Sequence, residues 1–174
     1  MRAVAIVVLG LLTAACGFQL RGQARLPFET LYVALPETSL LGTELKRNII
    51  AGTHTRLVND PAQAQAILSL VAEVRDKTIL SFDSAGRVRE LQLHYRLSFR
   101  VRDARGRDYL PRSEIRATRD ISYSDAQVLS KESEEQLLYR DMQSDMVQQI
   151  LRRLAAAPAE PIAFEPEAKD AAAR

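Results

Sequence analysis

The clearest pattern along the chain is a strict alternation of apolar and polar residues from Leu91 to Val101. Period two over this length predicts a long β-strand with one buried face and one face in water. The buried side is predicted to hold Leu91, Leu93, Tyr95, Leu97, Phe99 and Val101, and the wet side Gln92, His94, Arg96, Ser98 and Arg100. Residues 66–74 and 113–123 predict two further strands, with turn sequences between the strands at 83–86 and 103–108. We therefore expect an antiparallel three-stranded meander.

Two amphipathic helices are predicted, one before this meander in the sequence and one after it. The first follows a short β-rich segment, residues 30–35, and has Thr38 or Ser39 as its N-cap and Gly52 as its stop signal. The second is capped by Ser130 and ends before Pro158. The apolar positions recur at helical spacing at Leu41, Leu45 and Ile49 in the first helix and at Leu138, Met142, Met146, Ile150 and Leu154 in the second.

These elements sum to the order β-α-β-β-β-α. We expect an α+β fold in which two helices pack on one face of a mostly antiparallel four-stranded sheet. The folded domain is predicted over residues 16–157. Residues 158–174 are rich in Ala, Pro and Glu, a composition that predicts a disordered tail.

The N-terminus has the layout of a secretory signal peptide, which we assign to residues 1–15. Arg2 precedes an apolar run, and two small residues, Ala14 and Ala15, stand directly before Cys16. The run is too short to span a bilayer comfortably, and a buried N-terminal helix is the alternative. Small residues before a lone cysteine resemble the bacterial lipobox, which implies a covalent lipid anchor on Cys16. Gly17, rather than Asp, then resembles the signal for transport to the outer membrane.

Charge is distributed unevenly along the mature chain. Residues 87–119 contain ten arginines and four acids, whereas residues 120–174 contain eleven acids and six bases. An arginine-rich sheet favours forked contacts to phosphate or carboxylate groups. An exported protein rarely meets nucleic acid, so anionic lipid head groups are the expected polyanions. With two histidines, one cysteine and no Gly-rich phosphate loop, the sequence predicts a non-enzyme without a metal or soluble cofactor.

Several segments together resemble the LptE family of lipopolysaccharide-assembly lipoproteins. The resemblance rests on the lipobox, on Cys16, Gly17, Phe18, Leu20 and Arg21, on the element order, and on the segment at 127–154 that begins "QVLSKESEE". It covers nearly the whole mature chain up to about residue 156. It implies an outer-membrane lipoprotein that plugs the LptD β-barrel as a 1:1 complex, binds lipopolysaccharide, and assists its assembly into the outer leaflet and the folding of LptD.

The resemblance also implies two basic positions in lipopolysaccharide binding. One matches Lys131, and the other lies in the turn before the long strand, at Arg87 or Arg89. The apolar residues Ile79, Leu80 and Phe82 near this turn are expected to meet acyl chains. The alternative for Lys131 is a helix residue paired with Glu135, four positions on.

A second class of function uses the same anchor and small α+β body. In this interpretation the chain is an envelope scaffold or activator lipoprotein that binds a periplasmic peptidoglycan enzyme. Co-purification discriminates the two, because the first predicts a large outer-membrane barrel as partner and the second a periplasmic synthase.

Overall fold

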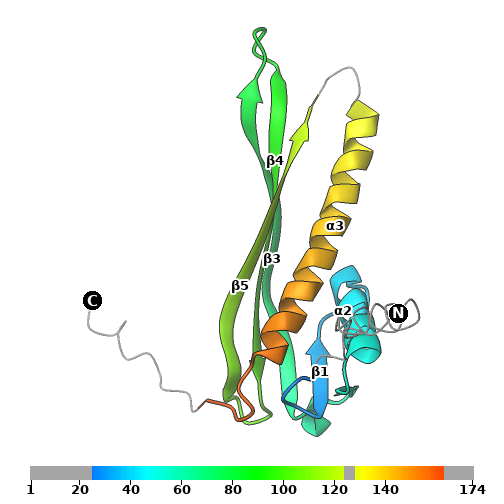
Figure 1. Cartoon of the computed structure of the whole chain (residues 1–174), viewed down its shortest axis with the longest axis vertical. Helices are drawn as coiled ribbons and strands as arrows, with labels where there is room; N and C mark the ends of the chain where they lie inside the picture. Colours follow the sequence, from blue (N-terminus) through cyan, green and yellow to red (C-terminus); the bar gives the residue numbers. More distant parts are fainter. Residues whose placement is uncertain (1–24, 124–127, 163–174) are drawn as a thin grey trace, which may run out of the picture.

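The computed structural model describes residues 25–123 and 128–162, which form a long β-ribbon flanked by helices (Figure 1). The predicted leader, Cys16 and the segment after it lie outside the described residues. The elements in chain order are β1 (Thr30–Ala34), α2 (Leu40–Gly52), β2 (Arg56–Leu57), the 3₁₀ turn η1 (Pro61–Gln63), β3 (Ala66–Phe82), β4 (Val88–Arg102), β5 (Asp108–Ser122) and α3 (Val128–Ala155).

The described residues form one mixed sheet with the strand order β2-β1-β3-β4-β5. The predicted meander is confirmed, because β4 pairs antiparallel with both β3 and β5. The prediction of four mostly antiparallel strands was wrong in detail, since β1 pairs parallel with β3 and with the two-residue β2. The helix α2 between β1 and β2 returns the chain to the same end of the sheet, and parallel pairing follows.

Strand β3 is much longer than its predicted span of residues 66–74. It continues to Phe82 and pairs with β4 from Ile67 onward, through register shifts after Leu70, Ile79 and Ser81. Beyond Leu70 the positions that face α3 are occupied by Glu73, Arg75 and Lys77 rather than by apolar residues. Because these residues are charged, this half of the strand lacks the apolar–polar alternation from which a strand is predicted.

Both helices cover the same face of the sheet, as predicted, and a single core joins them. The six predicted apolar positions of β4 are all buried, together with Leu41, Leu45 and Ile49 of α2. Side chains of α3 complete the core, which contains Met142, Met146, Val147, Ile150 and Leu154. On the opposite face of β4, Ser98 is buried to 4% exposure although it was predicted to face water. Its short side chain lies on that face between those of Arg96 and Arg100.

The ends of the predicted helices are partly corrected. Ser39 caps α2, its hydroxyl accepting from Gly42 N at 3.0 Å. Helix α3 begins at Val128, so Ser130 lies inside the helix and is not its cap. After Ala155 the described chain continues past the predicted boundary at 157, and Ile162 N donates to Asp108 O at the start of β5. The remainder of the predicted tail lies outside the described residues.

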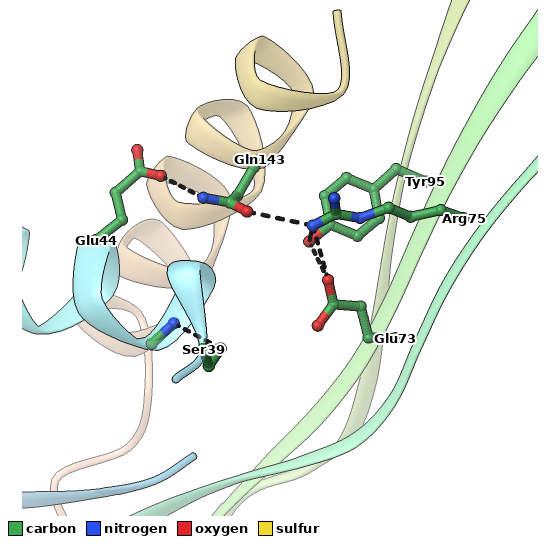
Figure 2. Close-up of polar contacts among 7 residues, drawn as sticks. Ser39, Glu44, Glu73, Arg75, Tyr95 and Gln143 are labelled. Atoms are coloured by element: carbon green, nitrogen blue, oxygen red, sulfur yellow. Dashed lines mark hydrogen bonds and ion pairs between the residues drawn. The ribbon is translucent and has the colours of Figure 1, made fainter. Parts of the chain in front are cut away.

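A polar network ties α3 to the sheet and to α2 (Figure 2). The Arg75 guanidinium lies over the Tyr95 ring at 4.5 Å and donates to the Tyr95 hydroxyl at 3.1 Å. It also donates to Glu73 at 2.9 Å and to Gln143 Oε1 at 3.2 Å. Gln143 in turn donates to Glu44 on α2 at 2.8 Å. One chain of contacts therefore fixes the separation of β3, α3 and α2.

Two turns of the same chemistry close the two ends of β4. In the turn before β4, Asp83 Oδ1 accepts from the backbone N–H groups of Ala85 and Arg87, while Oδ2 accepts from Arg87 Nε at 2.8 Å. Asp103 makes the same three contacts in the turn after β4, with Arg107 at 2.7 Å. Each turn requires one residue with a positive φ angle, which glycine adopts without strain: Gly86 at 78° and Gly106 at 84°.

The hydroxyl of Tyr95 should contribute measurably to stability. It is buried, donates to Glu73 at 2.7 Å and accepts from Arg75, so Tyr95→Phe removes two hydrogen bonds without creating a cavity. We expect the free energy of unfolding to fall by about 1 kcal/mol in urea denaturation. Tyr32→Phe is the matched control, since the Tyr32 hydroxyl has no hydrogen bond within the described part of the chain. Equal stability of both variants would contradict the network.

The two turn aspartates predict a loss of stability in acid. Hydrogen bonds from Arg87 lower the pKa of Asp83. Burial alone would raise the pKa of Asp103, but hydrogen bonds from Arg107 and Arg105 offset it and leave this pKa lowered as well. Because both folded-state values lie below the unfolded value of about 3.9, the stabilisation is complete above that pH and is lost as the pH falls through the folded pKa values.

The test is the free energy of unfolding measured between neutral pH and the acid range in the wild type and in Asp103→Asn. The asparagine keeps a turn-forming acceptor but cannot titrate. We expect the variant to be less stable near neutrality and to lose less stability on acidification. Parallel pH profiles would show that Asp103 does not carry this dependence.

Candidate functional site

The candidate site lies at the end of the ribbon where the β3–β4 hairpin projects (Figure 1). Three features of the chain meet at this end: the turn from Asp83 to Arg87, the end of β5, and the start of α3. The hairpin extends beyond β5, so its last residues have strand neighbours only within the hairpin. The predicted site residues therefore come from separate elements that the topology brings to one end of the domain.

Arg87 lies at the tip of the hairpin, where its backbone N–H donates to Asp83 Oδ1 at 2.9 Å. It forms an ion pair with Asp83 at 2.8 Å, and its side chain is 65% exposed. Arg89 is similarly exposed, and its one ion pair among the described residues is a longer contact to Glu90 at 3.4 Å. Glu90 also accepts from the Ser81 hydroxyl at 2.6 Å, and these two contacts lower its pKa. Both arginines are accessible to an anionic ligand from solvent.

Lys131 lies in the first turns of α3 and is far less exposed than the two arginines. Its ammonium donates to Ser122 Oγ at 3.0 Å and to Glu134 at 2.8 Å. The expected helical partner, Glu135, instead pairs with Lys77 of β3 at 2.8 Å, a contact that raises the pKa of Lys77. The predicted pairing with Glu135 was therefore wrong, because Lys77 reaches that carboxylate across the helix–sheet interface. Lys131 cross-links the end of β5 to the helix.

The structure brings the three predicted cations to one end but not into one cluster. Each contacts its own acid, and within the described residues they share no hydrogen-bonding partner. Next to them the side of the hairpin carries large apolar side chains in contact with water: Ile79, Leu80 and Phe82 are 49%, 49% and 59% exposed. A tip with guanidinium groups beside exposed apolar side chains is suited to an amphiphilic anion.

Sequence reasoning missed the residues that hold this tip in position. Tyr139 donates to the backbone oxygen of Asp76 at 2.9 Å, and together with the Lys77–Glu135 pair it fastens the first half of α3 to the free edge of β3. The available signal was the run of charged residues at positions 73, 75 and 77. Three charges on a core-facing side of a strand indicate polar partners on a neighbouring element.

Other chemistries find little support in the described residues. No group of three His, Cys, Asp or Glu side chains there has the arrangement of a metal site. His94 lies on the open face of the sheet, where its ring nitrogen contacts the Thr78 hydroxyl at 3.0 Å. Although α3 has 28 residues, no helix in the described ranges is apolar enough to cross a membrane.

Comparison with solved structures identifies close relatives of this fold. The solution structure of uncharacterized lipoprotein B from Nitrosomonas europaea is 45% identical, with a TM-score of 0.69, and the match covers 80% of this chain and 91% of that one. A minor lipoprotein from Acinetobacter baumannii is 26% identical, with a TM-score of 0.62 and coverages of 74% and 92%. Rare lipoprotein B from Shewanella oneidensis, at 22% identity and a TM-score of 0.62, shares the fold.

Comparison of sequences agrees with the structural result. The LPS-assembly lipoprotein LptE of Photorhabdus laumondii is 24% identical over 148 residues, which are 83% of this chain and 79% of that protein. Residues 28–154, from just before β1 to the last turn of α3, match the family described as LptE, lipopolysaccharide-assembly. The chain belongs to the LptE family of lipopolysaccharide-assembly proteins.

Proposed function

We propose that this protein is an outer-membrane lipoprotein, anchored through Cys16, that occupies the lumen of the LptD β-barrel and binds lipopolysaccharide at its hairpin tip. Membership of the LptE family supports a role in lipopolysaccharide assembly, and the solved relatives are lipoproteins. In this role the protein assists insertion of lipopolysaccharide into the outer leaflet and folding of the barrel. It performs no bond-making chemistry, so its contribution is binding and positioning.

The proposed binding of lipopolysaccharide rests on one observation, namely that the hairpin tip combines exposed arginines with exposed apolar side chains. Exposed guanidinium groups of Arg87 and Arg89 lie on the same hairpin as the exposed side chains of Ile79, Leu80 and Phe82. Lipid A presents phosphates next to acyl chains, and guanidinium groups bind phosphate with forked, charge-assisted hydrogen bonds. The apolar side chains gain free energy when acyl chains remove them from water.

The open face of the sheet supports the proposed position inside a barrel. On this face Arg96 pairs with Asp76 at 2.6 Å, and Gln92 donates to Asp120 at 2.8 Å. Arg96 and Arg116 lie directly opposite each other in the β4–β5 register, and Arg116 is paired with Glu114. Such pairs place compensated charges on a polar surface, which suits the polar interior of an outer-membrane barrel.

Charge reversal at the tip should weaken lipopolysaccharide binding. We expect Arg87→Asp combined with Lys131→Asp to reduce affinity by about tenfold or more, since each substitution replaces a charge-assisted contact with repulsion. Binding is measured with purified lipopolysaccharide, and circular dichroism checks the fold. Arg47→Asp, an exposed residue of α2, makes a matched charge change at a distance from the tip. Unchanged binding in the double variant would remove Arg87 and Lys131 from the site.

The protein should co-purify with a large outer-membrane barrel when it is extracted from its native membrane. Mass spectrometry of the same material should show an N-terminal peptide that begins with an acylated Cys16. Three acyl chains would hold the protein stably, whereas one chain binds a membrane only marginally. Recovery of a periplasmic synthase in place of a barrel would favour the scaffold or activator function, and an unmodified Cys16 would contradict the anchor.

A further inference from the structure

Strand β5 forms one edge of the sheet, and half of its backbone polar groups face away from β4. The order of the sheet places β5 at this edge, and its pairing with β4 is regular from Ser113 to Ser122. Tyr123 N donates to Arg89 O, which fixes the alternation of the ladder. The odd-numbered residues 115–121 therefore bond to β4, and the even-numbered residues 114–122 direct N–H and C=O groups outward.

Arginine side chains of this chain already occupy two of the outward carbonyl oxygens. Arg153 of α3 donates to Glu114 O at 2.8 Å, and Arg119 donates to Thr118 O at 2.9 Å. The outward N–H groups of Arg116 and Thr118 face the same side of the strand. The outward carbonyl oxygens of Glu114 and Thr118 are thus occupied, while the N–H groups of Arg116 and Thr118 have no partner on β4. This arrangement disfavours an added β-strand, which would need both donors and acceptors.

Helix α3 slants across the sheet toward β5 (Figure 1). Side chains of the two elements line a groove along this edge. The groove has a volume of about 580 Å³ and is lined by residues 116–119 of β5 and by Asp145, Gln148, Gln149 and Arg152 of α3. Arg119 pairs with Asp145 at 2.5 Å, which offsets the one acid in the lining. Arg152, by contrast, has no ion pair within the described ranges.

We propose that this groove is an oxyanion-binding site that accepts a phosphate or carboxylate group. The donors that line it are the guanidinium of Arg152, the side-chain amide of Gln149 and the outward backbone N–H groups of β5, whereas Gln148 directs its amide nitrogen to Asn48 of α2 at 3.3 Å. Arg116 and Arg119 of the lining are paired with Glu114 and Asp145, so the net positive charge of the groove is that of Arg152. A planar guanidinium beside backbone N–H donors matches the several lone pairs of a phosphate or carboxylate.

The site is separate from the hairpin tip. It uses none of Arg87, Arg89 or Lys131, and its residues come from the middle of β5 and the second half of α3. The proposal therefore does not depend on lipopolysaccharide binding at the tip. The group it accepts belongs either to an acidic lipid or glycan, such as lipopolysaccharide, or to a free inorganic anion.

The test is a titration of the ¹⁵N-labelled full chain, in neutral detergent micelles, with inorganic pyrophosphate. We expect the amide resonances of Arg116 and Thr118 to shift, with saturation. Arg152→Gln should weaken this binding about tenfold, the effect of losing one charge-assisted contact. Arg119→Gln should weaken it at least as much, because it also frees the Asp145 carboxylate to repel the anion. Arg140→Gln, an exposed position elsewhere on α3, is the matched control and should change the affinity less than twofold.

The outcomes separate this site from the tip. Pyrophosphate binding that survives Arg87→Gln with Lys131→Gln and is weakened by Arg152→Gln supports the groove. Absence of the amide shifts in the wild type, or equal effects of Arg152→Gln and Arg140→Gln, would overturn the proposal. If lipopolysaccharide displaces pyrophosphate from the groove, the anion it takes is part of a lipid. If pyrophosphate remains bound, the site takes a free anion.

Discussion

The structure depends on the contact between α3 and the apolar face of β4. The three long strands extend far beyond the short β1 and β2, so α3 is the element that covers the ribbon over most of its length (Figure 1). Met142, Met146 and Ile150 are fully buried against the lower half of the sheet. Toward the tip the interface becomes polar, through Gln143, Tyr139 and Glu135. Hydrophobic burial holds the base, and directional hydrogen bonds set the position of the helix above it.

This change along the helix has a consequence for how the tip is supported. Apolar packing is non-directional and tolerates small shifts of one element past another, whereas hydrogen bonds and ion pairs require particular atoms at particular distances. The contacts of Lys77 with Glu135 and of Tyr139 with Asp76 therefore place the hairpin relative to α3 more sharply than burial would.

Much of the fold could be predicted because binary patterning is a local signal. The alternation at 91–101 fixed the buried face of β4, and the spacing of Leu41, Leu45 and Ile49 fixed the buried face of α2. The second half of β3 could not be predicted, because Glu73, Arg75 and Lys77 take their partners from other elements, Tyr95 among them. The two-residue β2 is equally invisible, since it exists only through its pairing with β1.

The residues of the candidate site could be predicted from the sequence, but the contacts that their side chains make could not. Arg87, Arg89 and Lys131 were identified from motif resemblance, which carries no information on side-chain partners. The pairing of Lys131 with Ser122 and Glu134 depends on where β5 ends beside α3. The β5 groove had a weaker signal, namely Arg119 on an otherwise apolar face. A charge in such a position indicates a partner on the covering helix, here Asp145.

The matched aspartate–arginine turns at the two ends of β4 fix its register with β3 and β5. A slip of one residue between paired strands would rotate every side chain of β4 to the opposite face, and both turns would have to break for this to happen. Each end of β4 is thus held in register, and the separation of buried from water-facing side chains is kept over the whole strand.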